Sequence, residues 1–393
     1  MKEILLKDVE AGMITAEAVT TKSGQKLADK DTVLSKQLIA RFTFYHIQSV
    51  KVNEPVEEIE EDVNQAETVS GPDFVVSIVE DDLREKAIEE TPVREVSFFE
   101  EHASFKQKLA QTPEYREFQL SYALCLEDLK KNFEKIKKGE FDIEKQPILE
   151  HSKGISKYRT PLELFNMIRG MQFSEDSIYS HSLNVALEAS VLGKWLKFDA
   201  QTIYRLTSAA LVHDIGKTVV PPEILNKKDK LSEIEFEEIK KHTIYGNKIL
   251  KDAGYDICYR NAALQHHERN DGSGYPRALT GDEIDDFAAI VALVDVYDAM
   301  TSPRPQRRPL STFEVIEEFE KIGFEKYNTK YLLTFLSHLA GMHHNAMVML
   351  DDGTVGRVVY INQSKLSRPI VENNNGTIID LSREKDRKII KCL

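Results

Sequence analysis

The stretch HHERNDGSGYP, residues 266–276, is the most informative part of this 393-residue sequence. Its two adjacent histidines, His266 and His267, run into charged residues and then into a glycine-rich turn that Pro276 closes. Successive residues at a helix end point about 100° apart, so two neighbouring imidazoles can reach two adjacent ligand positions. Glycines let a backbone pass close to a bulky ligand, and proline restricts the turn. The stretch therefore predicts a junction between metal chemistry and a substrate loop.

Apolar residues recur at intervals of three and four on both sides of this stretch, which predicts amphipathic helices. The pattern is clear in FQLSYALCLEDLKKNFEKIKKG (118–139), SLNVALEASVLGKWLKF (182–198) and DFAAIVALVDVYDAM (286–300). We expect a mainly α protein in which residues 97–340 form an all-helical domain.

The flanking segments have a different composition. Residues 1–53 mix β-branched patches with turn residues and predict a small α+β domain. Six acidic residues between Glu54 and Asp62 open a predicted linker over residues 54–96. Two strand–turn–strand patterns, residues 346–361 and 368–381, predict a β-rich extension over residues 341–393.

Composition limits the function. The net charge of −13 argues against a general binder of nucleic-acid polymers, which requires a basic face. The three cysteines, Cys125, Cys258 and Cys392, lack metal-site spacing and indicate a reducing compartment. Because no signal-peptide core and no apolar run of about 20 residues occurs, we expect a cytoplasmic protein without a membrane partner.

Seven imidazole and carboxylate donors fall at or near the ends of predicted helices in the helical domain. Imidazole and carboxylate without thiolate suit iron, manganese, zinc or nickel. Seven donors exceed the needs of one ion and can hold two, about 3.5–4 Å apart, with Asp214 as the natural bridge. We call these residues the ligand cluster: His181, His213, Asp214, His242, His266, His267 and Asp295.

A pair of ions that shares a hydroxide suits phosphoester hydrolysis, because it supplies a nucleophile at neutral pH and polarises the phosphoryl group. Lys217 follows Asp214 by three residues and shares its face if the helix continues, so its ammonium could meet a bound phosphate. The alternative for Lys217 is an exposed lysine at a helix end.

Four motifs together resemble the HD-GYP family: HDIGK (213–217), KKHTIYG (240–246), HHERNDGSGYP and DVYDAMTSPRPQRRP (295–309). The resemblance covers roughly residues 115–345. It implies a helical HD-type fold and a phosphodiesterase that hydrolyses cyclic di-GMP to pGpG and often on to GMP. The implied cofactors are two divalent ions, iron or manganese, held by the ligand cluster with Asp214 bridging them.

The resemblance also implies substrate contacts. Lys217 matches a lysine that touches the substrate phosphate, and Gly272, Gly274, Tyr275 and Pro276 match the loop at the pocket mouth. Arg304 and Arg307 match a basic pair that contacts the other phosphate or a guanine. Further expected partners are a GGDEF-domain protein and a second copy of the chain.

The sequence departs from the family at two places. Ser177 stands where members with a third metal carry glutamate, so two metals are expected. Pro303 and Gln306 alter the segment around the arginines, which leaves an alternative open: a catalytically weak module that binds cyclic di-GMP or a GGDEF partner as a sensor. Another cyclic dinucleotide as substrate is a third reading.

Overall fold

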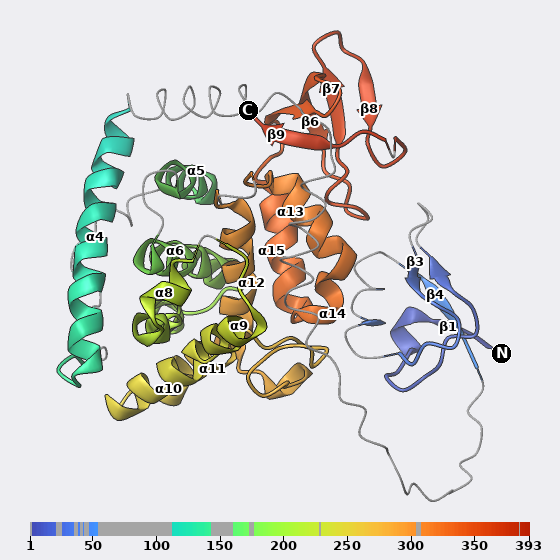
Figure 1. The fold of residues 1–393 in the computed structure, drawn as a ribbon. Coiled ribbons are helices and arrows are strands. Elements are labelled where there is room, and N and C mark those ends of the chain that lie inside the picture. The colour runs from blue at the N-terminus through green and yellow to red at the C-terminus, as the bar shows by residue number, and fades with distance from the viewer. Residues whose placement is uncertain are drawn as a thin grey trace, which may run out of the picture. The chain divides into compact units, whose positions relative to one another are not determined.

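The computed structural model describes residues 2–20, 26–34, 38–39, 42, 47–53, 112–142, 160–172, 177–227, 229–303, 308–384 and 386–393. The chain divides into two compact units (Figure 1). One is Glu80–Leu310, and the other combines Met1–Val79 with Ser311–Leu393.

The unit Glu80–Leu310 is helical in its described part. Its helices are α4 (Pro113–Lys137), α5 (Pro161–Gln172), α6 (Ile178–Trp195), α7 (Ala200–Val212), α8 (Pro222–Leu225), α9 (Glu233–Lys240), α10 (His242–Asp252), α11 (Ile257–Gln265) and α12 (Asp286–Thr301). Short 3-10 turns, η3 (Ile215–Val219) and η4 (Gly281–Glu283), interrupt the series. Helix α6 packs against α4, α7 and α12, while α11 packs against α7, α10 and α12.

Polar caps set where the central helices begin. Ser177 accepts a hydrogen bond from the Ser180 amide at the start of α6. Asp199 and Asp285 do the same for α7 and α12. Such caps satisfy amides that the first helical turn leaves without partners. These three helices therefore begin at positions that their own sequences specify.

The C-terminal part of the second unit joins helices to a sheet. The helices are α13 (Thr312–Glu318), the π-helical η5 (Phe319–Gly323), α14 (Phe324–Lys326) and α15 (Thr329–Gly341). Strands β5 (Met347–Leu350), β6 (Val355–Tyr360), β7 (Ile370–Asn373), β8 (Ile378–Asp380) and β9 (Ile389–Cys392) form one antiparallel sheet in the order β8-β7-β6-β5-β9. The two predicted hairpins, β5–β6 and β7–β8, are both present.

The N-terminal residues form two small antiparallel pairs. Strand β1 (Lys2–Leu5) pairs with β4 (Ser49–Val52), and β2 (Val19–Thr20) pairs with β3 (Lys26–Ala28). A 3-10 turn, η1 (Leu6–Asp8), follows β1.

The mainly α fold class with a β-rich C-terminal region is confirmed. The acidic linker of residues 54–96 lies outside the described residues, and the domain boundaries stay predictions. Among the described helices, none combines the length and apolar character needed to cross a membrane.

Candidate metal centre

The ligand cluster comes together from five helices of the Glu80–Leu310 unit. His181 lies on α6, and His213 with Asp214 follows the last turn of α7. His242 is the first residue of α10, His266 and His267 follow α11, and Asp295 lies on α12. Residues separated by as many as 114 positions in the sequence therefore meet at one place.

Asp214 is the centre of the cluster. Its Oδ1 lies 3.3 Å from His242 Nε2 and 3.6 Å from His266 Nε2. Its Oδ2 lies 3.5 Å from His213 Nε2 and 3.7 Å from His181 Nε2. Each oxygen thus faces two imidazoles, which is the arrangement expected of a carboxylate between two ions.

Three of the imidazoles are oriented by carbonyl groups in or beside their own helices. The Nδ1–H groups of His213, His242 and His266 donate to Ala210 O (2.7 Å), Ile239 O (2.6 Å) and Ala262 O (3.0 Å). Donation from Nδ1 fixes the tautomer that leaves Nε2 as the lone-pair nitrogen. Each of these three nitrogens then points its lone pair toward Asp214 rather than toward solvent.

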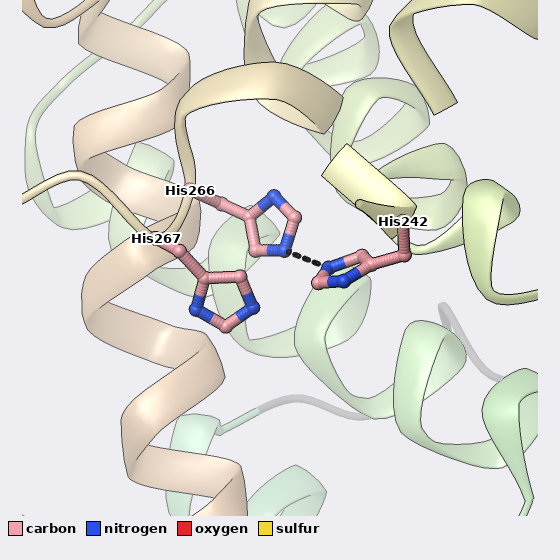
Figure 2. Close-up of side chains that lie close together, drawn as sticks. All are labelled: His242, His266 and His267. Atoms are coloured by element: carbon pink, nitrogen blue, oxygen red, sulfur yellow. Dashed lines mark hydrogen bonds between the residues drawn. The ribbon is translucent and has the colours of Figure 1, made fainter. Parts of the chain in front are cut away.

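The three histidines around α10 and α11 form one half of the cluster. Figure 2 shows the rings of His242, His266 and His267 gathered between the start of α10 and the end of α11, with 3.3 Å between the Nε2 atoms of His242 and His266. Two lone-pair nitrogens at that distance repel each other unless a proton or a metal ion lies between them. The close approach therefore supports a cation at this position.

Burial keeps most of these histidines neutral. It lowers the pKa of His213 to about 4 and that of His242 to about 3, and it lowers the pKa of His267 well below its usual value. Burial would raise the pKa of Asp214, but the charge of the Lys217 ammonium and the imidazoles around the carboxyl outweigh it and hold this pKa well below its usual range. Neutral imidazoles around an ionised carboxylate are the protonation states that metal ligands require.

His181 is held differently, by two carboxylates on α12. Its Nε2 lies 2.9 Å from Asp295 Oδ1, and its Nδ1 lies 2.7 Å from Asp298 Oδ2. Burial lowers the pKa of His181, but the hydrogen bonds to Asp295 and Asp298 outweigh it and raise the pKa to about 10. These carboxylates therefore favour protonation of His181 in the absence of a metal ion, and a metal ion bound at Nε2 would replace the proton there while Nδ1 keeps its bond to Asp298.

The cluster fits two divalent ions. Two triads, each with ligand atoms within 4.8 Å of one another, divide it: His242, His266 and His267 on one side, and His181, His213 and Asp295 on the other. Three of its buried atoms, His213 Nε2, Asp214 Oδ1 and His267 Nδ1, have no hydrogen-bond partner. Buried polar atoms are normally satisfied, so three unsatisfied atoms in one cluster fit a site at which these atoms would bind a cation.

Lys217 lies at the edge of the cluster. Its Nζ donates to Asp214 Oδ2 at 2.7 Å, and its side chain is 23% exposed. The spacing of three residues that predicted a shared face is realised across the 3-10 turn η3. An ammonium that is anchored to Asp214 and still reaches solvent can meet an anion bound beside the cluster.

The glycine-rich loop folds back onto the histidines. The ring of Tyr275 stacks on that of His267, with centroids 4.7 Å apart. Glu268 accepts hydrogen bonds from the amides of Arg277 (2.7 Å) and Leu279 (3.0 Å), which closes the loop on itself. A Cβ at Gly274 would overlap the backbone of Glu268 and Arg269, so only glycine fits there.

Not every predicted contact can be placed. Gly272 and Pro276 lie in the same loop. A β-bridge between Asp271 and Thr280 closes this loop at its base. Arg304 and Arg307 lie outside the described residues. Ser177, at the position that would hold a third-metal glutamate, caps α6 instead.

Sequence reasoning missed Asp298, which orients His181. The signal was available in DVYD (295–298), since two aspartates three residues apart share one face of a helix. A carboxylate behind a ligating histidine is a common feature of metal sites.

The chain resembles known proteins in the region that carries the ligand cluster. Residues 171–329 match the HD domain family. The chain is similar to a cyclic di-GMP phosphodiesterase of Pseudomonas aeruginosa, at 31% identity over 54% of this chain and 51% of that protein. It is similar to a cyclic di-GMP phosphodiesterase of Thermotoga maritima, at 35% identity over 44% of this chain and 48% of that protein.

A third relative is named for a different substrate. It is 3'3'-cGAMP-specific phosphodiesterase 1 of Vibrio cholerae, at 40% identity over 35% of this chain and 32% of that protein. The chain spans about half the length of the first two relatives and about a third of the third.

A helical unit that gathers imidazoles and carboxylates around the His213–Asp214 pair is an HD domain with a ligand set suited to divalent metal ions. The glycine-rich loop that ends in Gly274, Tyr275 and Pro276 narrows the class further. By this combination of motifs and matches, residues 171–329 resemble the HD-GYP type of HD domain.

Proposed function

We propose that the chain is a metal-dependent phosphodiesterase that hydrolyses cyclic di-GMP to linear pGpG and then to GMP. The observation that carries the proposal is the position of Asp214, with four imidazole Nε2 atoms between 3.3 and 3.7 Å from its oxygens and a triad of possible ligands on either side. Relatives named as cyclic di-GMP phosphodiesterases support the choice of substrate.

Different residues of the chain would have different roles in this reaction. Asp214 would hold both ions, and the two triads would complete their ligand shells, with iron or manganese as the proposed metals. When bound, such a pair of ions supplies a water of lowered pKa and polarises the scissile phosphoryl group. Lys217 would neutralise a phosphate oxygen next to the cluster.

The loop around Tyr275 would shape the substrate end of the site. Tyr275 covers His267 and offers an aromatic face next to the α10–α11 triad, and Gly274 keeps the loop backbone close to Glu268. We place Arg304 and Arg307 on the second phosphate or a guanine base, because a substrate with two anionic diesters needs cations beyond Lys217.

A second candidate substrate is 3'3'-cGAMP. The similarity to an enzyme of Vibrio cholerae that is named for this dinucleotide favours it. The ligand cluster acts on a phosphodiester, which both molecules share, so it does not separate them. Discrimination would have to come from the residues that contact the bases.

A direct assay tests both substrates. The protein is purified without oxygen, loaded with Fe(II) or Mn(II), and incubated separately with cyclic di-GMP, 3'3'-cGAMP and cyclic di-AMP. Chromatography should show pGpG and then GMP from cyclic di-GMP, and EDTA should stop the reaction. If the protein binds cyclic di-GMP but forms no product with either metal, the proposal of an enzyme fails and the chain acts as a sensor module.

The remaining partners and the compartment belong to the same proposal. We place the protein in the cytoplasm and retain a GGDEF-domain protein and a second copy of the chain as possible partners. Light scattering of the purified protein measures the oligomeric state, and co-purification with a GGDEF-domain cyclase measures that interaction.

A further inference from the structure

A buried chain of hydrogen bonds runs from α4 to His181. The hydroxyl of Tyr122 on α4 donates to Asn184 Oδ1 on α6 at 2.8 Å, with Ser180 O as a second and longer acceptor at 3.2 Å. Asn184 Nδ2 donates to Asp298 Oδ1 on α12 at 3.1 Å, and Asp298 Oδ2 accepts from His181 Nδ1 at 2.7 Å. Tyr122, Asn184 and Asp298 are 1%, 3% and 2% exposed, so solvent does not compete for these bonds.

Helical spacing places these groups in line. His181 and Asn184 lie three residues apart on α6, and Asp295 and Asp298 lie three residues apart on α12, so each pair shares one face of its helix. Since α6 packs against both α4 and α12, its polar face is reached by the tyrosine from one helix and by the carboxylates from the other.

The direction of each hydrogen bond in this series fixes the orientation of the next group. Tyr122 donates to the amide oxygen of Asn184, which leaves the amide nitrogen to face Asp298. That bond occupies one oxygen of Asp298, and the other oxygen accepts from His181 Nδ1. With its proton held at Nδ1, His181 directs Nε2 toward Asp214 and Asp295, where a metal ion would bind.

We infer that Tyr122 and Asn184 are positioning residues for His181, and that the contact of α4 with α6 sets the metal affinity of the triad His181, His213 and Asp295. The inference rests on the proposed two-ion site. The other triad is not reached by this chain of bonds, because His242 and His266 are oriented by main-chain carbonyls of Ile239 and Ala262. A substitution at Tyr122 should therefore weaken the binding of one ion and leave the affinity for the other unchanged.

The test compares two tyrosine variants. Tyr122→Phe removes the donor to Asn184, while the control Tyr255→Phe removes another buried hydroxyl, which donates to Phe141 O at 2.9 Å and takes no part in this series of bonds. Metal-free wild type and both variants are titrated with Co(II), and calorimetry gives the affinity of each site while the visible spectrum reports ligand geometry. Thermal unfolding in EDTA measures the structural effect of each change.

Tyr122→Phe should bind one Co(II) on the order of tenfold more weakly and alter its visible spectrum, with the second site unchanged. Tyr255→Phe should bind both ions as wild type does, although both variants unfold at a lower temperature in EDTA. Asn184→Ser should repeat the selective loss and serves if Tyr122→Phe does not fold.

Three results would overturn the inference. The first is wild-type Co(II) affinity and spectrum in Tyr122→Phe or Asn184→Ser. The second is equal loss at both sites, which marks a general structural defect. The third is a wild-type protein that binds no Co(II). This result would contradict the two-ion site of the proposed function, and it differs from the first two results because it is seen without any variant.

Discussion

Two buried carboxylates in different units of the chain behave in opposite ways. Asp214 lies in the ligand cluster at 0% exposure, and Glu320 lies in the π-helix η5 of the other unit at 3% exposure. Burial favours the protonated form of both. Lys217 and His213 outweigh it at Asp214 and hold its pKa well below the usual range, whereas burial prevails at Glu320 and raises its pKa to about 7.

The difference follows from the partners that each carboxylate has. Both oxygens of Glu320 accept bonds from Ser367, at 3.3 Å from its amide and 2.5 Å from its hydroxyl. Asp214 Oδ1 has no hydrogen-bond partner although it lies among imidazoles. A buried carboxylate with its bonds made serves the fold, and one that is left charged and incompletely bonded is arranged for a ligand.

Removing the carboxylate should have the largest effect at Asp214. Asp214→Asn keeps the side-chain volume but takes away the charge that both triads face. We expect the metal content to fall from about two ions per chain to one or fewer, and turnover of cyclic di-GMP to fall by at least about 10³-fold. Elemental analysis and a product assay on the same sample measure the two effects together.

Glu320→Gln is the matched control for Asp214→Asn, because it is the same chemical change at another buried carboxylate. It should keep the wild-type metal content and turnover. If Asp214→Asn retained two ions and full turnover, Asp214 would not lie between the metals.

A smaller loss is expected at Lys217, which contacts Asp214 Oδ2 at 2.7 Å. Lys217→Met keeps the length of the side chain and removes the ammonium, so kcat/KM for cyclic di-GMP should fall about 100-fold. The metal content should not change. Lys227→Met is the control, since Lys227 pairs with Glu235 at 2.6 Å. Equal losses in the two variants would remove Lys217 from the substrate site.

Much of the centre could be predicted because its signals are local. Helical periodicity gave the elements, and the paired histidines of HHERNDGSGYP marked two ligands with the loop that follows them. Asp298 was missed because its partner, His181, lies 117 residues away, and sequence alone does not show which face of α12 meets α6. Glu320 was missed for the same reason, since Ser367 lies 47 residues further along the chain.

Gly216 in HDIGK shows a constraint that only the packing reveals. A Cβ at this position would overlap the carbonyl oxygen of His242, so α10 can approach η3 only if residue 216 is glycine. Gly216→Ala should lower the free energy of unfolding by about 3 kcal/mol, because the backbone at His242 must move. Urea unfolding of the metal-free protein measures this loss.

Gly341→Ala is the control for Gly216→Ala. Among the described residues, no atom outside the neighbouring residues and the backbone of its own helix lies within 4 Å of a Cβ at Gly341, which ends α15. Alanine there should be neutral or stabilising by up to about 1 kcal/mol. Similar losses in both glycine variants would show that the approach of α10 to η3 does not depend on Gly216.

The smallest expected effect is a dependence of stability on pH that comes from Glu320. Its pKa is about 7 in the folded chain and near 4.5 when unfolded, so between these values the folded state holds more protons. The free energy of unfolding should therefore fall by on the order of 3 kcal/mol as the pH rises from 4.5 through 7, and this contribution should be constant above about pH 8.

Glu320→Gln should remove this contribution, because an amide does not titrate and can still accept a bond from Ser367. Urea unfolding of metal-free protein at several pH values measures the difference between wild type and variant. That difference isolates Glu320 from other titrating groups, including the histidines of the ligand cluster. If the free energies of unfolding of wild type and Glu320→Gln change in parallel from pH 4.5 to 7, the buried carboxyl of Glu320 ionises as it does in the unfolded chain. The contrast with Asp214 would then fail.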